Sequence, residues 1–373
     1  MRVKNAFRTF TVLIMMGAGM GCRLSDDSGG ASRRIGVEGR LAKSFLSSQG
    51  AFGPQWTFLP IVPEDRTQDL ALLLLSSGSK AYSGLILSND RLALLAPWLE
   101  EVSLVEPEAY RRDVVQGLRL GSRYVAMPLS VRVPVMVYRK DLWARYGLDP
   151  PATPMALERA AGVLEKASDP TRGRIRTIVP AEELLWSLSW GARGDFSTAL
   201  YEREKIQALG RIASWEIGGE AYGSRRDFLE ARLAGLILYS DQARRLLYDA
   251  RLESKEDLVG LAPVPSMHGA RSLNAGFSLL IMGKADDAAD WRTFSSEGFY
   301  AWVRAQGWDT PCALQDPRGD PIGKLAAETR FPPFLLPQEL RHYARDAVED
   351  VLAGAATAEE ALRRACARQE HGG

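Results

Sequence analysis

The chain has 373 residues, of which 46% are hydrophobic and 25% are charged, and this length favours two or three packing units. The apolar content is sufficient for a buried core and excludes an intrinsically disordered chain. Lys and Arg total 47 against 46 Asp and Glu, a net charge of +1, so the concentrated basic face that nucleic-acid binding requires is not expected.

The N-terminal segment has the pattern of an export signal. Three basic residues come first: Arg2, Lys4 and Arg8. The stretch 10–21 is apolar or small, is too short for the roughly 20 residues of a membrane span, and ends directly before Cys22. Small residues before one cysteine resemble a bacterial lipobox, which predicts a signal peptide over 1–22 and lipidation of Cys22. Secretion without a lipid and a noncleaved anchor are the alternatives.

A polar segment, 23–34, follows as a tether. We therefore expect a protein that is exported and lipid-anchored to the outer face of a bacterial membrane, in the periplasm or at the cell surface.

The remaining cysteines and the histidines do not predict a metal site. Cys312 and Cys366 form an even pair, which an oxidising compartment could join in a disulfide, with two free thiols as the alternative. The histidines are widely separated, and none has a second ligand at metal spacing: His268, His342 and His371. We expect neither a metal nor a cofactor.

Behind the tether, short β-rich runs alternate with amphipathic helical stretches, as in α/β sheets. The first half contains predicted strands at 35–37, 56–62, 83–87, 124–127 and 131–138. Predicted helices lie at 69–76 and along the apolar stripe that begins at Leu157. Pro128 separates the last two strands, and this position fits a chain that crosses between two lobes.

The second half continues the alternation and shows no internal repeat. Its predicted strands are 236–239, 258–263 and 277–282, and its predicted helices are 206–215, 227–233, 288–297, 298–305 and 340–351. Gly276 leads into the strongly apolar third strand, and a capping box from Thr357 to Glu360 starts the final helix.

Four segments, taken in order, carry a resemblance to a known family. They are the apolar strand ending at Pro128 with Val137–Trp143 and Tyr146–Thr153 after it, Phe228–Leu238, Asn274–Phe277 and Gly354–Leu362. This order resembles the family 1 extracellular solute-binding proteins, which are receptors of carbohydrate-type ABC importers and include the maltodextrin binders. Arg139 replaces the family's usual Asn.

The resemblance implies an α/β, two-lobed periplasmic binding protein type II fold, with an inter-lobe ligand cleft and crossover hinge strands. The expected first lobe is 35–131 plus 277–315, and the second is 132–276 plus 316–370. The implied function is a monomeric receptor, not an enzyme, that delivers a small polar solute such as a sugar or sugar acid to the transmembrane subunits of an ABC importer.

By the same resemblance, ligand contacts belong at strand ends and crossovers. Asp90 and Arg91 fall on the acid–base pair after the third strand, with a solvated loop pair as the alternative. Trp186 is a candidate platform for a sugar ring, and a buried core tryptophan is the alternative. Tyr239 and Asp241 end a strand where the family often contacts ligand, although Asp241 could instead cap the next helix.

Three further residues complete the candidate site. Arg132 stands where maltodextrin binders carry a carboxylate, and Arg341 where they carry a tryptophan. The planar donor fork of arginine suits an acidic sugar or another anion. A hinge ion pair for Arg132 and a solvated helical position for Arg341 are the alternatives, and Asn274 is an amide contact at the second crossover.

Two other functions remain open from the sequence. An exported hydrolase is disfavoured because the chain has no Gly-x-Ser-x-Gly elbow and too few histidines for the usual triads. A degenerate binding protein that serves as a ligand sensor or interaction subunit would account for the eroded family motifs.

Overall fold

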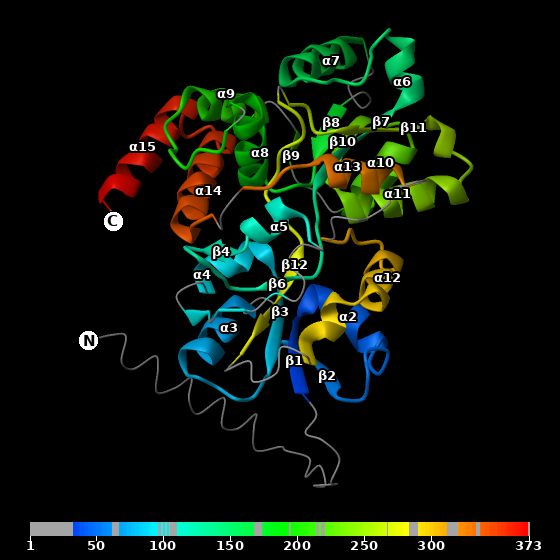
Figure 1. Ribbon diagram of the computed structural model, residues 1–373. Coiled ribbons are helices and arrows are strands. Elements are labelled where there is room, and N and C mark those ends of the chain that lie inside the picture. The colour runs from blue at the N-terminus through cyan, green and yellow to red at the C-terminus, as the bar shows by residue number, and fades with distance from the viewer. Residues whose placement is uncertain are drawn as a thin grey trace.

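The computed structural model describes residues 33–61, 67–95, 98–99, 101–102, 104, 110–167, 174–193, 195–213, 216–217, 221–266, 268–282, 290–311, 320–332 and 336–371. Two five-stranded sheets lie one above the other in separate lobes (Figure 1). Cys22 with its leader, nearly all of the tether, and Cys312 lie outside these residues. Within the described residues, every helix is too short or too polar to cross a bilayer.

The lower lobe is built on the sheet with strand order β2-β1-β3-β12-β6. Its strands are β1 (Arg33–Glu38), β2 (Trp56–Ile61), β3 (Gly84–Ser88), β6 (Met127–Pro128) and β12 (Phe277–Ile281). The first three are parallel, and β12 is antiparallel to both β3 and β6. Helices of this lobe include α2 (Gly39–Ser47), α3 (Thr67–Ser76), α4 (Leu92–Leu95) and α12 (Glu297–Ala305).

The upper lobe contains the second sheet, in the order β11-β7-β10-β8-β9. Its strands are β7 (Pro134–Arg139), β8 (Arg174–Thr177), β9 (Glu216–Ile217), β10 (Leu233–Tyr239) and β11 (Val259–Pro263). All seven residues of β10 are buried, because helices cover both faces of this central strand. The two sheets therefore have separate cores.

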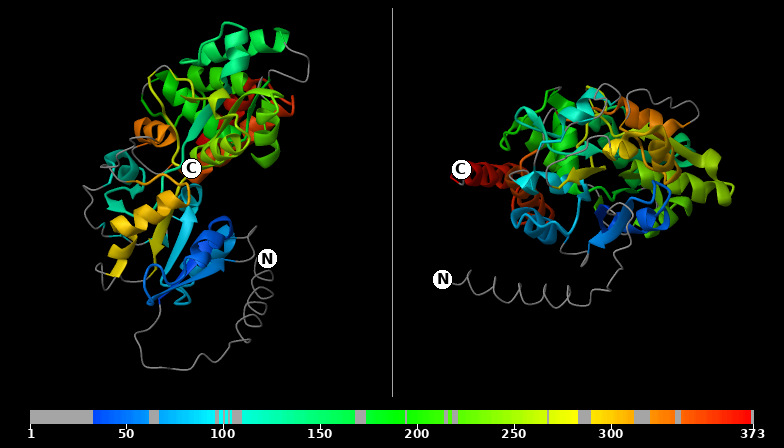
Figure 2. Two further views of the ribbon diagram at one scale, coloured as in Figure 1. Left: turned by 90° about the vertical axis from the view of Figure 1, so that its right-hand side faces the viewer. Right: turned by 60° about the horizontal axis from the view of Figure 1, so that its bottom comes forward.

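Helices account for most of the upper lobe. They include α6 (Lys140–Arg145), α7 (Pro154–Ala167), α8 (Ala181–Arg193), α9 (Arg203–Ile212), α10 (Ala221–Leu229), α11 (Ser240–Leu252), α13 (Pro321–Glu328), α14 (Gln338–Leu352) and α15 (Ala358–His371). The C-terminal pair α14 and α15 packs against α8 and α9, which precede it by more than a hundred residues (Figures 1 and 2).

The chain crosses between the lobes from β6 to β7, from β11 to β12, and again from α12 to α13. The first two crossings run side by side: the Ala275 amide donates to Arg132 O, and the Ser130 amide donates to Phe277 O. Gly276 permits this approach, because a Cβ there would lie 2.2 Å from Ser130 O. The first crossing therefore follows Pro128 directly, as the position of this proline in the sequence indicated.

The third crossing is tied to the first by a backbone bond from the Val131 amide to Asp309 O, 2.8 Å. Arg244 of α11 also donates to the carboxylates of Asp309 and Asp320, which lie on either side of that crossing. Burial raises the pKa of the Asp309 carboxyl despite the neighbouring Arg244. Hydrogen bonds thus connect all three crossings to one another or to the upper lobe.

Some predicted elements were wrong in extent. The helix predicted over 227–233 ends at Leu229, Ala231 takes a left-handed φ of 61°, and β10 begins at Leu233. Sequence reasoning also missed α11, whose buried side is narrow in an otherwise charged helix. The predicted strand 124–127 is split, because Tyr124 belongs to a short hairpin of β4 (Arg119–Leu120) and β5 (Arg123–Tyr124).

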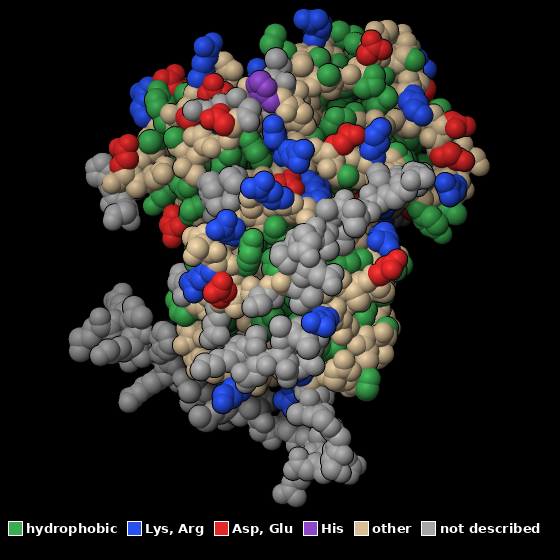
Figure 3. Space-filling view, viewed as in Figure 1, with side chains coloured by type: hydrophobic (Ala, Val, Ile, Leu, Met, Phe, Trp, Pro, Cys, Tyr) green, Lys and Arg blue, Asp and Glu red, His purple; other side chains and the backbone are tan. Residues whose placement is uncertain are grey.

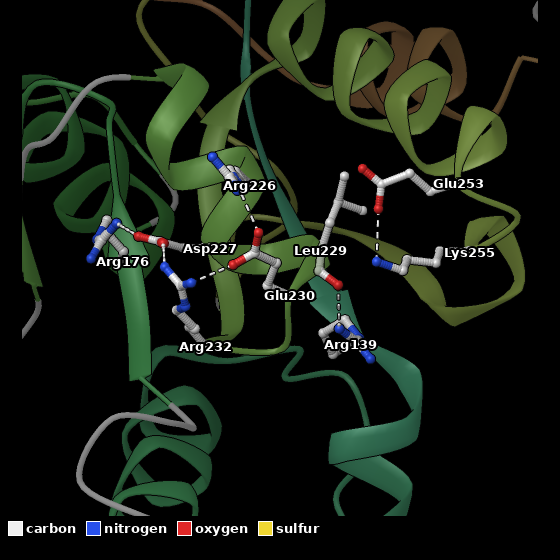
Figure 4. Close-up of polar contacts among 9 residues, drawn as sticks. All are labelled: Arg139, Arg176, Arg226, Asp227, Leu229, Glu230, Arg232, Glu253 and Lys255. Atoms are coloured by element: carbon white, nitrogen blue, oxygen red, sulfur yellow. Dashed lines mark hydrogen bonds and ion pairs between the residues drawn. The ribbon is translucent and has the colours of Figure 1, made fainter.

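Arg139, which departs from the family motif, has a structural role. Its guanidinium donates to the carbonyl of Leu229 at the C-terminus of α10 (Figure 4). It also donates to the carbonyl of Phe228 and pairs with Asp141 at 2.7 Å. A cation at this helix end satisfies carbonyls that have no partner within the helix. These contacts offset the cost of burying the Arg139 guanidinium. An arginine is therefore accommodated at a position where the family motif usually has an asparagine.

Cys366 lies partly buried on α15 with a free thiol. The disulfide between Cys312 and Cys366 stays a prediction, because Cys312 lies outside the described residues.

Candidate functional site

Polar residues gather where the two lobes face each other, around the crossings. Figure 3 shows basic side chains, with acidic side chains among them, on the part of the upper lobe that lies next to the lower lobe. The lower lobe contributes the short 3₁₀ helix η2 (Asn89–Arg91) directly after β3. The upper lobe contributes residues at the ends of β10, α8 and α14.

The two predicted site residues on η2, Asp90 and Arg91, have different surroundings. Arg91 forms an ion pair with Glu38 of β1, Nε to Oε1 3.4 Å, and the Glu38 side chain is only 4% exposed. Glu38 also accepts from the backbone amide and hydroxyl of Ser88. Arg91 therefore helps to hold the end of β3. Asp90 instead faces the upper lobe, since its charge raises the pKa of both Glu183 and Tyr239.

Arg132, in the first crossing, is held by the upper lobe. Its Nε donates to Asp241 Oδ1 at 2.7 Å, and its guanidinium carbon lies 3.8 Å from the centre of the Tyr239 ring. The nearby Asp241 carboxylate raises the pKa of Arg132 against the opposing effect of burial. Three predicted site residues therefore meet, and the hinge ion pair is the arrangement that the structure has for Arg132.

Glu183, which sequence reasoning missed, joins this group from the first turn of α8. It is 6% exposed, and burial raises its pKa from the ordinary value of 4.5 to about 7. Arg341 opposes that shift, Asp90 adds to it, and the phenol of Tyr239 hydrogen-bonds to the carboxyl group. Its sequence neighbourhood carries no signal that separates Glu183 from the adjacent Glu182, because the burial of a carboxyl group depends on tertiary packing.

We refer to Asp90, Arg132, Glu183, Tyr239 and Asp241 as the crossing cluster. Its members come from both lobes and include two acids that repel each other, Asp90 and Glu183. Burial also raises the pKa of the Tyr239 phenol well above its usual value. The cluster is largely desolvated and internally bonded, so its groups bind one another as well as facing the cleft.

Trp186 lies elsewhere. Its side chain is 1% exposed, stacks on Phe196 with ring centres 5.9 Å apart, and has the Lys205 ammonium 4.8 Å above its ring. Trp190 is 7% exposed and packs edge to face on Phe196. The structure thus favours the core alternative for Trp186, because no ring face is open to a ligand.

The remaining predicted residues, Asn274 and Arg341, line a pocket beside the crossing cluster. Its cavity volume is about 30 Å³. The polar side chains in its wall are those of Asn89, Asn274 and Arg341, and the other lining residues are Val114, Gly117, Leu118, Leu273, Phe331, Pro332 and Leu336. We call this the donor pocket, because each of the three polar side chains carries N–H donors.

Asn89 was missed by sequence reasoning, although it directly precedes Asp90. Asn89 is 4% exposed, and its Oδ1 accepts a hydrogen bond from the Ser278 hydroxyl at 2.7 Å. Its Nδ2 has no acceptor within the described part of the chain. A buried amide donor without an acceptor costs about 1–3 kcal/mol, which makes it a candidate ligand contact.

Among the described residues, no group of three His, Cys, Asp or Glu side chains is arranged to hold a metal ion. The chemistry that the site offers is hydrogen bonding and ion pairing in a half-buried cleft.

Comparison with known proteins places this fold. No family model and no curated protein matches the chain. Solved structures match nearly its whole length. The sugar-binding protein MalE from the phytopathogen Xanthomonas citri has a TM-score of 0.73 at 17% identity, covering 91% of this chain and 96% of that one.

Two further structures show the same similarity. The GacH receptor of Streptomyces glaucescens, solved unliganded and with acarbose, has a TM-score of 0.70 at 14% identity and covers 91% of this chain and 98% of its own. A cyclo/maltodextrin-binding protein complexed with maltotetraose has a TM-score of 0.68 at 18% identity, covering 92% and 98%. The chain therefore has the α/β, two-lobed fold of periplasmic binding proteins.

Proposed function

We propose that the protein is an extracytoplasmic receptor that binds a small polar solute between its lobes and delivers it to the transmembrane subunits of an ABC importer. The structural similarity to sugar-binding proteins over nearly the whole chain supports this function. So do the three crossings, which give the lobes a hinge about which they can close on a solute. The protein binds its solute and releases it unchanged, without acting as an enzyme.

The proposal includes the organisation expected from the sequence. The first lobe is 35–131 plus 277–315, the second is 132–276 plus 316–370, and the receptor is a monomer. The leader 1–22 directs export, and Cys22 carries the lipid that holds the protein at the outer face of a bacterial membrane.

One observation carries the proposal: polar groups of both lobes converge where the chain crosses between them. Asp90 of the lower lobe lies close enough to Glu183 and Tyr239 of the upper lobe to shift their pKa values. Asn89, from the lower lobe, and Arg341, from the upper one, line the same pocket. A solute bound there contacts both lobes and stabilises the closed arrangement by its higher affinity for it.

The test is thermal unfolding of the purified protein with a panel of sugars, sugar acids and sugar phosphates. A solute at 100 times its dissociation constant stabilises the fold by about 2.7 kcal/mol, which appears as a rise in melting temperature. Small-angle scattering with the same solute should show a smaller radius of gyration, because the lobes close.

Chromatography of the solute after incubation separates a receptor from a hydrolase. We expect the compound to be recovered intact. Turnover of any panel member would contradict the receptor function, and a rise in melting temperature without compaction would favour a sensor that binds without closing.

A further inference from the structure

We propose that the solute carries a carboxylate, which lies in the donor pocket against Arg341, Asn89 and Asn274. This inference rests on the proposed receptor function and specifies the chemical class of its ligand. Its basis is that each polar side chain in the wall of the pocket has its acceptor atoms occupied, or has none, while donors remain.

Asn274 is oriented by the backbone. Its Oδ1 accepts from the Arg132 amide at 3.2 Å and from the Gly276 amide at 2.9 Å. Backbone N–H groups only donate, so both bonds require the oxygen at this position and leave the Asn274 amide nitrogen as the group available to the pocket. The crossing that positions Asn274 therefore also selects which end of its amide a ligand meets.

Asn89 is oriented in the same sense from the lower lobe. The Ser278 hydroxyl of β12 donates to Asn89 Oδ1 at 2.7 Å, which leaves Nδ2 buried and without an acceptor in the described chain. Because η2 follows β3 directly, the rigid sheet places this donor. A bound acceptor atom would remove the cost of leaving it unsatisfied.

Arg341 adds a permanent positive charge. It lies half-buried in the first turn of α14, and a guanidinium has five donors and no acceptor. No ion pair to the Arg341 side chain is found within the described residues, although its charge lowers the pKa of the nearby Glu183 carboxyl group. A planar fork of this kind matches the two oxygens of a carboxylate.

The wall as a whole favours an ionised acid over a neutral sugar. A sugar hydroxyl both donates and accepts, so it also needs acceptors. Among the described residues that line this pocket, the side-chain oxygens of Asn89 and Asn274 already accept hydrogen bonds, and N–H donors remain. The remaining lining side chains are apolar, so they suit the carbon skeleton of a small organic acid better than an inorganic anion. The cavity volume of about 30 Å³ has room for a carboxylate group and not for a whole sugar, so the rest of the ligand lies outside the pocket.

The experiment is isothermal titration calorimetry with matched pairs that differ in one oxidised carbon. The probes are glucose and glucuronate, galactose and galacturonate, with maltose and inorganic phosphate as further probes. We expect at least one uronate to bind, and its neutral counterpart to bind at least about tenfold more weakly, because a hydrogen bond to a charged group is worth about 1.5–3 kcal/mol.

Variants then assign the binding to the pocket. R341Q should weaken uronate binding about tenfold or more, and N89D should do the same because it replaces the buried donor with an anion at unchanged shape. R345Q is the matched control: Arg345 lies one turn further along α14, is half exposed and pairs with Glu182. It removes the same charge from the same helix and should leave the affinity unchanged.

The outcomes distinguish this inference from the function on which it rests. If a neutral sugar or maltose binds as tightly as the uronates, the receptor stands and the carboxylate inference fails. Binding of phosphate in preference to the uronates would likewise overturn it, as would equal losses in R341Q and R345Q. If no probe binds, the carboxylate inference fails, and the receptor function is then decided by the thermal-unfolding panel of sugars, sugar acids and sugar phosphates.

Discussion

Two arginines near the same cleft have opposite relations to their surroundings. Arg132 has an ion pair with Asp241 and an aromatic ring beneath its guanidinium, whereas Arg341 faces a pocket whose other polar side chains are also donors. Arg132, Tyr239 and Asp241 of the crossing cluster therefore have partners inside it, although Glu183 Oε2 has no hydrogen-bond partner within the described residues. In the donor pocket, Asn89 Nδ2 lacks an acceptor within the same residues. The comparison teaches that residue type alone does not separate a hinge contact from a ligand contact; the partners do.

The largest expected effect concerns the crossing itself. G276A should lower the free energy of unfolding by about 3 kcal/mol, because the new Cβ would lie 2.2 Å from Ser130 O and 2.7 Å from Ser130 C, both backbone atoms that cannot move independently. Urea unfolding followed by circular dichroism measures the loss.

The control for this variant is G210A in α9, where an added Cβ meets nothing within 4 Å. Because alanine favours a helix, we expect G210A to be neutral or slightly stabilising. Equal stability of G276A and G210A would contradict the close approach of the crossing strands.

Glu183 lies between the two regions, and its titration tests their electrostatics. The groups that face it are Tyr239, Asp90, Arg341 and its neighbour Glu182. Burial raises its folded pKa to about 7 from the ordinary 4.5, so the folded state holds its proton where the unfolded chain has released it. This contribution to stability is therefore complete below about pH 4.5 and is lost as the pH rises through 7, by up to about 3 kcal/mol.

The measurement is the free energy of unfolding at pH 5 and pH 8 for wild type and E183Q. The variant cannot ionise at this position, so it should lose less stability between the two pH values than the wild type. E182Q alters the adjacent acid, whose partner is Arg345, and should keep the wild-type slope. Parallel pH curves for E183Q and wild type would show that Glu183 titrates normally.

A smaller effect separates the two arginines directly. R132M should cost about 2 kcal/mol, because it leaves the Asp241 carboxylate, 14% exposed, without its cation. R341M should change the free energy of unfolding by less than about 0.5 kcal/mol, since it breaks no ion pair within the described residues. Chemical denaturation of both variants makes the comparison.

Adding D241L to R132M provides the check on this prediction. Removing both charges should recover most of the loss, because the penalty comes from the unpaired carboxylate. If R341M proves as damaging as R132M, Arg341 has a structural role and the distinction between cluster and pocket fails.

Much of the fold could be predicted from the sequence because its signals are local. The strands β3, β10 and β12 are short apolar runs, and Pro128 and Gly276 mark the places where the chain leaves one sheet for the other. These features depend on backbone restriction and hydrophobic patterning, which neighbouring residues reveal. α11 was missed because its exposed, charged side outweighs its buried one in sequence.

The candidate site was predictable only in part. Asp241, Tyr239 and Arg132 lie at strand ends and crossings, where the resemblance to the solute-binding family placed them, and the structure brings them together. Glu183 and Asn89 were missed, because nothing in their sequence neighbourhood shows that a carboxyl group is desolvated or that an amide lacks an acceptor. Trp186 was a candidate platform for a sugar ring, but its side chain is buried in the structure. This burial depends on the packing of Phe196 and α9 against it.

The sequence by itself therefore determined an α/β chain whose crossings and strand ends can be located from apolar runs, prolines and glycines. Only the tertiary structure decided which polar groups bond to each other and which remain available to a solute. The physical reason is that a hydrogen bond or ion pair depends on a partner far away in the chain: Arg132 and Asp241 are 109 residues apart. Donor and acceptor can be counted only after folding has brought them together.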